Sequence, residues 1–125
     1  MDTGSVFANL AGGPVLQMSY SSGYNNLFDY NNLYTTGTSG FIAGTPTSSS
    51  FAAWRSTSGM DKHSVSYDPA ITSSTDAKPD VQNPAVWALN GHGVHIVGNN
   101  KDIDGNPRVE TRPDGVPDIG AYEKQ

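Results

Sequence analysis

Apolar residues occur in this chain in short runs, separated by glycine, asparagine and other turn-forming residues. Residues 6–10 and 14–18 are two such runs, and Ala11–Gly13 between them predicts a tight turn. Residues 27–34 are predicted to form a further strand, with the odd-numbered side chains on one face and the even-numbered ones on the other. Later strands are predicted at 64–67, 85–89 and 94–97.

Residues 48–58 predict one short amphipathic helix. The serines at 48–50 offer an N-cap, and Gly59 can end the helix. Phe51 and Trp54 are three residues apart, so both can pack on one surface. Because strands and helices do not alternate along the chain, a doubly wound parallel sheet is not expected.

The composition supports a β-rich chain with many turns. The 125 residues include 14 glycines and 8 prolines, a length that suits one domain or a piece of a larger protein. The net charge is −5, and ten of the nineteen charged residues lie after residue 100. Lys and Arg do not cluster, so nucleic acid is not an expected partner.

Composition also bears on where in or outside the cell the protein is expected. Neutral polar residues dominate the first half, as is typical of secreted β-rich proteins, and the absence of cysteine excludes disulfides. The chain has no signal peptide and no apolar run of about 18 residues, so no membrane span is expected. If the protein is exported, we expect the signal upstream and this chain to be a C-terminal piece.

The tetrapeptide Tyr-Asn-Asn-Leu occurs twice, at 24–27 and at 30–33. Asparagine caps exposed backbone groups and tolerates left-handed turns. In coiled β structures, asparagines at the corners of successive turns can hydrogen-bond along the axis. The six-residue spacing also fits a left-handed hexapeptide β-helix, but two copies are too few to favour that alternative.

Four segments occur in an order that resembles a known bacterial family: FDYNNLYTTG, FAAWRSTSGMDKHSVSYDPAI, KDIDGNPRV and PDIGAYE. They resemble the C-terminal part of right-handed parallel β-helix proteins of the pectin-lyase-like class, of the kind exported by Bacteroidetes. The closing segment resembles the choice-of-anchor Q region. The resemblance covers about Val6 to Glu123 and is most specific in the last two segments.

The resemblance implies an all-β fold, the last rungs and the cap of such a helix, with one short α-helix. Residues 1–47 would be the first rungs and a loop, 48–59 the helix, 60–98 the last rungs and 99–125 a charged C-terminal cap. Side chains expected to cover the end of the coil are Phe51, Trp54, Trp87, Ile119 and Tyr122. The segment NPAVWALNGHGVHIVG departs from the family pattern, so a compact β-sandwich-like unit is the alternative.

Acidic residues near the C-terminus could bind calcium. DIDGN has alternate carboxylates and a turn glycine, as calcium loops do, but the twelfth position from Asp102 is Pro113, so this is no EF-hand. The alternative is a turn whose carboxylates accept backbone hydrogen bonds and pair with Arg108 or Arg112. The candidate ligands are Asp102, Asp104, Asn106, Asp114 and Asp118.

Other patterns point only weakly to chemistry. DTGS at residues 2–5 copies an aspartic protease loop but lacks the preceding strand. His92 and His95 have a helical metal-site spacing, but Gly91 and Gly93 disfavour a helix there. No G-x-S-x-G elbow, P-loop or dinucleotide motif is present.

The aromatic residues could stack on sugars or could fill the core and cap. The candidates for a glycan-binding surface are Tyr24, Tyr30, Tyr34, Trp54 and Trp87. The sequence favours a non-catalytic capping domain of a secreted or cell-surface β-helix protein, associated with carbohydrate. Its expected partners are an upstream β-helix domain and a polysaccharide or cell-surface glycan. The alternatives are a carbohydrate-binding module and a fragment of a polysaccharide lyase or glycoside hydrolase.

Overall fold

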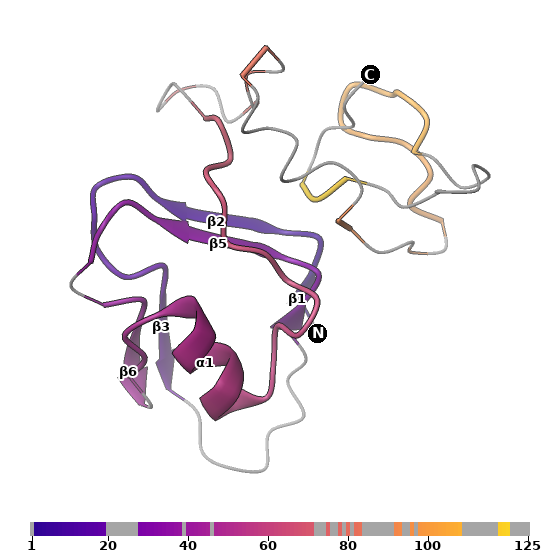
Figure 1. Cartoon of the computed structure of the whole chain (residues 1–125). Helices are drawn as coiled ribbons and strands as arrows, with labels where there is room; N and C mark the ends of the chain where they lie inside the picture. Colours follow the sequence, from indigo (N-terminus) through magenta and orange to yellow (C-terminus); the bar gives the residue numbers. More distant parts are fainter. Residues whose placement is uncertain are drawn as a thin grey trace.

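The computed structural model contains short strands and one helix (Figure 1). It describes residues 2–19, 28–38, 40–45, 47–71, 75, 78, 80, 82–83, 92–93, 96, 98–108 and 118–120. The elements are β1 (Asp2–Thr3), β2 (Val6–Asn9), β3 (Leu16–Ser19), β4 (Phe28–Asp29), β5 (Asn32–Thr35), β6 (Ile42–Thr45) and α1 (Phe51–Ser58).

The strands form three parallel pairs with one common register. β1 pairs with β4, β2 with β5 and β3 with β6. Asp2 lies opposite Phe28, Val6 opposite Asn32 and Leu16 opposite Ile42, so partners are always 26 residues apart. Parallel neighbours usually need a long crossover connection. Here the connection from each strand to its partner contains the other strands of the same turn.

The chain after β6 covers the far side of the second turn. Val65 forms a parallel bridge with Asn32, and Ser48 forms an antiparallel bridge with Ile42. The Leu33 N–H donates to the Val65 carbonyl at 2.9 Å, and the Val65 N–H donates to the Asn31 carbonyl at 2.8 Å. In Figure 1 the segment after α1 therefore runs alongside β5. In the predicted strand 64–67 only Val65 makes such a bridge. The predicted strand 85–89, and 94–97 apart from Ile96, lie outside the described residues.

The prediction of one continuous strand over 27–34 is wrong. Tyr30 has a φ of 57°, in the left-handed region, and separates β4 from β5. Asn31, Asn32 and Leu33 are then buried one after another instead of alternating between two faces. The bend makes a corner at which the side chains of Asn31 and Asn32 both point into the interior.

The helix α1 lies within the predicted range, and both of its ends are capped as the sequence indicated. The Ser50 hydroxyl accepts a hydrogen bond from the Ala53 N–H at 3.1 Å. Gly59 has a φ of 70°, and its N–H donates to the Arg55 carbonyl at 3.0 Å. Trp54 is buried and Phe51 half-buried, so the two expected side chains do face the rest of the fold.

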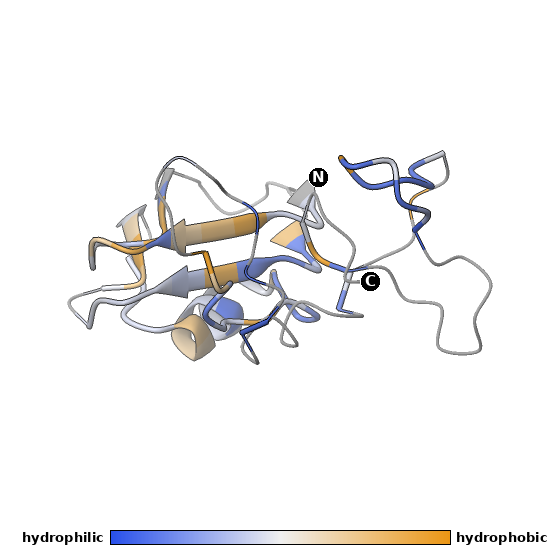
Figure 2. Cartoon of the chain, turned by 90° about the horizontal axis from the view of Figure 1, so that it is seen from above, coloured by the Kyte–Doolittle hydropathy of each residue, from blue (hydrophilic) through white to orange (hydrophobic). Residues whose placement is uncertain are grey.

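The core lies between the two turns of strands and α1. Figure 2 shows apolar segments in β2 and β5 and in α1, and mostly hydrophilic loops farther along the chain. Of the side chains expected to cover the coil end, Trp54 and Ile119 are buried and Phe51 packs on the core, whereas Trp87 and Tyr122 lie outside the described residues. The buried core cluster consists of Leu33, Phe41, Ile42, Trp54 and Met60.

Candidate functional site

The paired asparagines of the second repeat connect three levels of the fold. The Asn31 Oδ1 accepts from the Ser5 N–H at 2.9 Å, while the Asn31 N–H donates to the Ser64 hydroxyl at 2.9 Å. Asn32 faces the other way: its Oδ1 accepts from the Tyr67 N–H and its Nδ2 donates to the Tyr67 carbonyl, both at 2.9 Å. Both side chains are fully buried, so these bonds replace water for polar groups in the core. The first repeat, Asn25 and Asn26, lies outside the described residues.

A buried carboxylate fixes α1 to the chain that follows it. The Trp54 indole donates to the Asp61 Oδ2 at 2.7 Å, and the Ser64 hydroxyl donates to the Asp61 Oδ1 at 2.6 Å. Both donors are neutral, and Asp61 is itself buried with a φ of 56°. The Ser64 hydroxyl also accepts from the Asn31 N–H, so the network runs from the helix to the second turn.

Burial changes the interpretation of the aromatic candidates. Trp54 is 0% exposed, so its assignment to a glycan-binding surface is wrong: both ring faces are covered by the core. Tyr30 and Tyr34 are half-buried, and Tyr30 already stacks on the His63 ring, with centroids 4.8 Å apart. Tyr24 and Trp87 lie outside the described residues.

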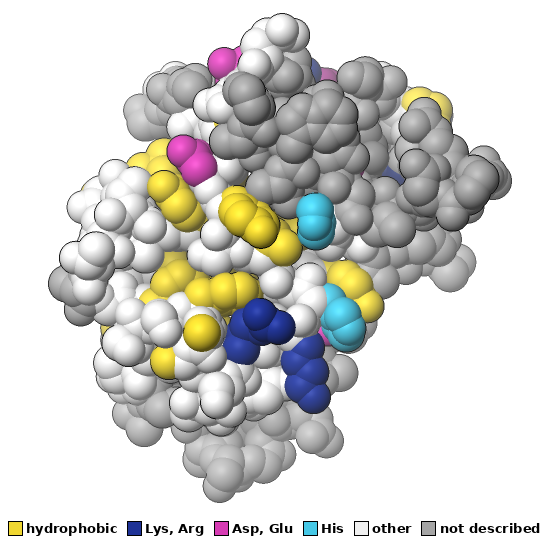
Figure 3. Space-filling model, viewed as in Figure 1, with side chains coloured by type: hydrophobic (Ala, Val, Ile, Leu, Met, Phe, Trp, Pro, Cys, Tyr) yellow, Lys and Arg dark blue, Asp and Glu magenta, His cyan; other side chains and the backbone are white. Residues whose placement is uncertain are grey.

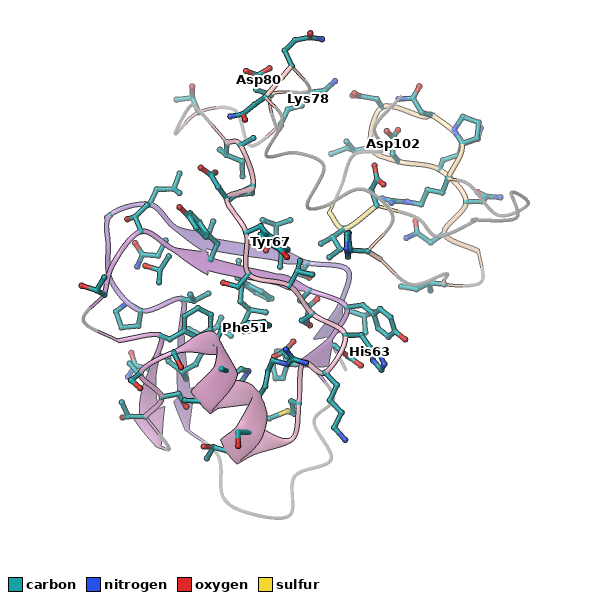
Figure 4. The ribbon with its side chains drawn as sticks, in the orientation of Figure 1. Phe51, His63, Tyr67, Lys78, Asp80 and Asp102 are labelled. Carbon is teal, nitrogen blue, oxygen red and sulfur yellow. The ribbon has the colours of Figure 1, made fainter. Side chains whose placement is uncertain are left out.

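The contact with the most evident acid–base character joins Asp29 and His63. The His63 Nδ1 lies 2.7 Å from the Asp29 Oδ2, and the His63 N–H donates to the Asp29 Oδ1 at 2.7 Å. Figure 4 shows His63 on the chain that follows α1, and Figure 3 shows Lys and Arg side chains beside a histidine on this face. The His63 side chain is 60% exposed, so the imidazole is open to solvent.

Partial burial of the Asp29 carboxyl opposes its ionisation. Hydrogen bonds from the His63 imidazole and from the His63 and Tyr30 N–H groups outweigh that effect and hold the pKa of Asp29 below its ordinary value. Sequence reasoning missed this pair, because the two residues are 34 positions apart and lie in different segments of the chain.

The pKa of Asp29 gives a pH-dependent prediction. Because the pKa is lowered in the folded chain, the contribution of Asp29 to stability is complete above about pH 4, the ordinary aspartate pKa. It is lost as the pH falls through the lowered pKa. We expect Asp29→Asn to unfold more easily than the wild type at pH 7 and to show a smaller difference at an acidic pH below the lowered pKa of Asp29. Urea unfolding at both pH values measures it, and an equal difference at both would contradict the assignment.

Three of the predicted calcium residues, Asp102, Asp104 and Asn106, lie in a loop held together by its own hydrogen bonds. The Asp102 Oδ1 accepts from the N–H groups of Asp104 and Asn106, at 2.9 and 2.8 Å, and the Oδ2 accepts from the Asn106 side-chain amide at 3.1 Å. The Asp104 Oδ2 pairs with the Lys78 ammonium at 2.7 Å. Figure 4 labels Lys78 and Asp102 on these neighbouring segments.

These contacts match the alternative in which the loop carboxylates cap backbone N–H groups. Arg108 donates to the carbonyls of Lys101, Asp118 and Gly120. Within the described residues, no three His, Cys, Asp or Glu side chains come together as metal ligands. Asp114, Arg112 and His95 lie outside the described residues.

β2 has one paired edge and one edge that faces away from β5. The Asn32 N–H donates to the Ser5 carbonyl and the Thr36 N–H to the Asn9 carbonyl. Because backbone groups alternate in direction along a strand, those of Val6 and Ala8 point away from β5. In the part of the chain that the structure describes, no strand pairs with this outer edge.

Residues 118–120 of the C-terminal segment contact one end of that edge. The Gly120 N–H donates to the Gly4 carbonyl at 2.9 Å, just before β2, and the neighbouring Ile119 is buried. A Cβ added at Gly120 would come 3.2 Å from the Val6 side chain, so this segment packs closely. Among the described residues, Val65 and Ser48 pair with the outer side of β5 and β6, whereas the outer side of the first three strands is contacted by a backbone hydrogen bond at Gly4.

Comparison of the chain with protein-family models, with curated proteins and with solved structures found no match. In the described ranges, α1 is too short to cross a membrane, and no other helix there could do so.

Proposed function

We propose that this chain is a non-catalytic structural unit that ends a right-handed parallel β-helix in a secreted or cell-surface protein. One observation carries the proposal: three strand pairs share a 26-residue offset, the second turn is paired on its outer side, and no strand among the described residues pairs with the outer side of the first turn. A coil built on this offset can continue only from the open side.

The physical need for such a unit is clear. The last turn of a parallel coil exposes a row of N–H and C=O groups and an apolar interior, which promote association with other chains. Here the backbone of Val65 forms hydrogen bonds with the Asn31 carbonyl and the Leu33 N–H, and Trp54 from α1 covers the interior. Terminal units with a different structure are a general requirement of stacked repeats.

The sequence adds two supporting points. The segments around KDIDGNPRV and PDIGAYE resemble the C-terminal region of exported β-helix proteins, and Ile119 of the second segment is buried beside Gly4. Association with a polysaccharide rests on that resemblance alone. The burial of Trp54 weakens the glycan-binding alternative, which needs exposed aromatic rings.

Residue-resolved hydrogen exchange on the 125-residue chain at low concentration tests the proposal. We expect slow exchange for Phe7, whose N–H faces β5, and for Asn32 and Leu33, which donate to Ser5 and Val65. Val6 and Ala8 should exchange quickly. Equal protection at Val6, Ala8 and Phe7 would mean that the edge is already covered, and would end the proposal.

A second measurement tests the proposal that the chain is not an enzyme. Incubation with acidic and neutral polysaccharides should release no new reducing ends or unsaturated products. Reproducible turnover that is lost on His63→Ala would replace the structural proposal with an enzymatic one, because His63 and Asp29 form the most evident acid–base pair among the described residues.

A further inference from the structure

We propose that Asn32 stops the strand pairing on the outer side of the second turn. Its side-chain amide binds the backbone of Tyr67, which would otherwise pair with β5. This inference rests on the proposed function, since it names the residue that keeps the coil from adding another strand. The segment concerned follows α1, and in residues 64–68 Val65 alone forms a bridge to β5.

The backbone N–H groups of β5 alternate in direction, as they do in any strand. The Asn32 N–H donates to the Ser5 carbonyl of the first turn at 2.9 Å. The Leu33 N–H donates in the opposite direction, to the Val65 carbonyl, also at 2.9 Å. Two residues further on, the Thr35 N–H points the same way as that of Leu33. A regular parallel ladder would therefore continue with a hydrogen bond from the Thr35 N–H to the carbonyl two residues after Val65.

The residue two positions after Val65 is Tyr67, and its backbone is bonded to a side chain instead. The Asn32 Oδ1 accepts from the Tyr67 N–H, and the Asn32 Nδ2 donates to the Tyr67 carbonyl, both at 2.9 Å. No backbone hydrogen bond joins Tyr67 to Leu33 or Thr35, all three of which the structure describes. Because a primary amide offers both an acceptor and donors, it satisfies Tyr67 as a neighbouring strand would.

The residues after Tyr67 lead the chain away from the strands. The next residue whose N–H could face β5 is Pro69, which has no N–H. Ala70 follows with a φ of 57°, and its N–H donates to the Asp68 Oδ1 at 2.9 Å. Figure 1 shows the chain leaving β5 in this region, and Figure 4 labels Tyr67 there. Very short edge strands and prolines are features that keep a sheet edge from pairing further.

Hydrogen exchange of the wild-type chain, resolved by residue, is the first test. We expect the Tyr67 N–H to exchange at least about 10-fold more slowly than the Thr35 N–H, each relative to its unfolded rate. Protection of Thr35 equal to that of Leu33 would show that the backbone ladder continues, and would overturn the inference. Equally fast exchange of Tyr67 and Thr35 would overturn it too, because the Asn32 amide would then not hold Tyr67.

A pair of variants tests whether Asn32 is the cause. Asn32→Val removes the amide and suits a strand, so the Tyr67 carbonyl becomes available to β5. We expect the Thr35 N–H to exchange at least about 10-fold more slowly in this variant than in the wild type. The matched control is Asn31→Val, a neighbouring buried asparagine whose amide contacts Ser5, and it should leave Thr35 unchanged. An unchanged Thr35 in Asn32→Val, or equal slowing in both variants, would contradict the inference.

The same exchange data separate this inference from the proposed function. Slow exchange at Thr35 in the wild type, with fast exchange at Val6 and Ala8, would refute the role of Asn32 and leave the proposed function intact. Protection of Val6 and Ala8 equal to that of Phe7 would refute the proposed function, whatever Thr35 shows. If Asn32→Val fails to fold, the wild-type comparison of Tyr67 with Thr35 decides.

Discussion

Replacing Trp54 by phenylalanine should lower the free energy of unfolding by about 3 kcal/mol. The substitution removes the indole N–H that donates to the Asp61 Oδ2 at 2.7 Å, and it leaves a buried carboxylate oxygen without that donor. The smaller ring also leaves a gap in the core cluster next to Phe41 and Met60. Urea unfolding followed by circular dichroism measures the change.

A double variant separates the effect of the lost hydrogen bond from the effect of the gap in the core. Asp61→Asn removes the charge but keeps an oxygen for the Trp54 indole and an amide group beside the Ser64 hydroxyl. In the Trp54→Phe background, this second substitution should restore part of the lost stability, because an unpaired buried amide costs less than an unpaired buried carboxylate. A loss below about 1 kcal/mol for Trp54→Phe alone would show that the hydrogen bond does not anchor α1.

Asn31→Ala should lower the free energy of unfolding by about 2 kcal/mol. The Ser5 N–H would lose the Asn31 Oδ1 as its acceptor, and this contact joins the first turn to the second at the corner between β1 and β2. Asn31 is fully buried and Ser5 is half-buried, so water has limited access to the Ser5 N–H. Thermal and urea unfolding of the single variant both measure the effect.

Asn32→Ala provides the informative comparison. Asn32 makes two hydrogen bonds to Tyr67, but Tyr67 is 53% exposed, so its backbone can regain solvent partners. We therefore expect a smaller loss, about 1 kcal/mol, and almost none for the exposed control Gln17→Ala in β3. A larger loss for Asn32→Ala than for Asn31→Ala would contradict the role given to the corner contact.

The helix was predictable because its signals are local. Ser50, Gly59 and the spacing of Phe51 and Trp54 all lie within ten residues, and each acts as its residue type suggests. The strand pairing was not predictable from pattern, since the partners along the register are unlike: Val6 lies opposite Asn32 and Ala8 opposite Tyr34. Nothing in the sequence marks Tyr30 as a left-handed residue, so the strand predicted across it failed.

The candidate sites follow the same rule: contacts between near neighbours were predictable, and contacts between distant segments were not. The turn interpretation of DIDGN depends on neighbours two and four residues from Asp102, and those hydrogen bonds are present. The pair of Asp29 and His63 and the burial of Trp54 against Asp61 depend on how distant turns stack or on how the helix docks. Such contacts follow from the fold and have no signature of their own in a single sequence.

The uniform offset between paired strands bears on how such a chain can change its length in evolution. Duplication of a stretch of 26 residues would add one full turn and leave each neighbouring strand facing a partner of the same register. Between Asn32 and Val65 the offset is 33, and the extra residues lie in the stretch that contains α1, outside the strands. In the coil that we propose, insertions of other lengths would be tolerated in loops or helices outside the strands, and within the strands they would shift the register.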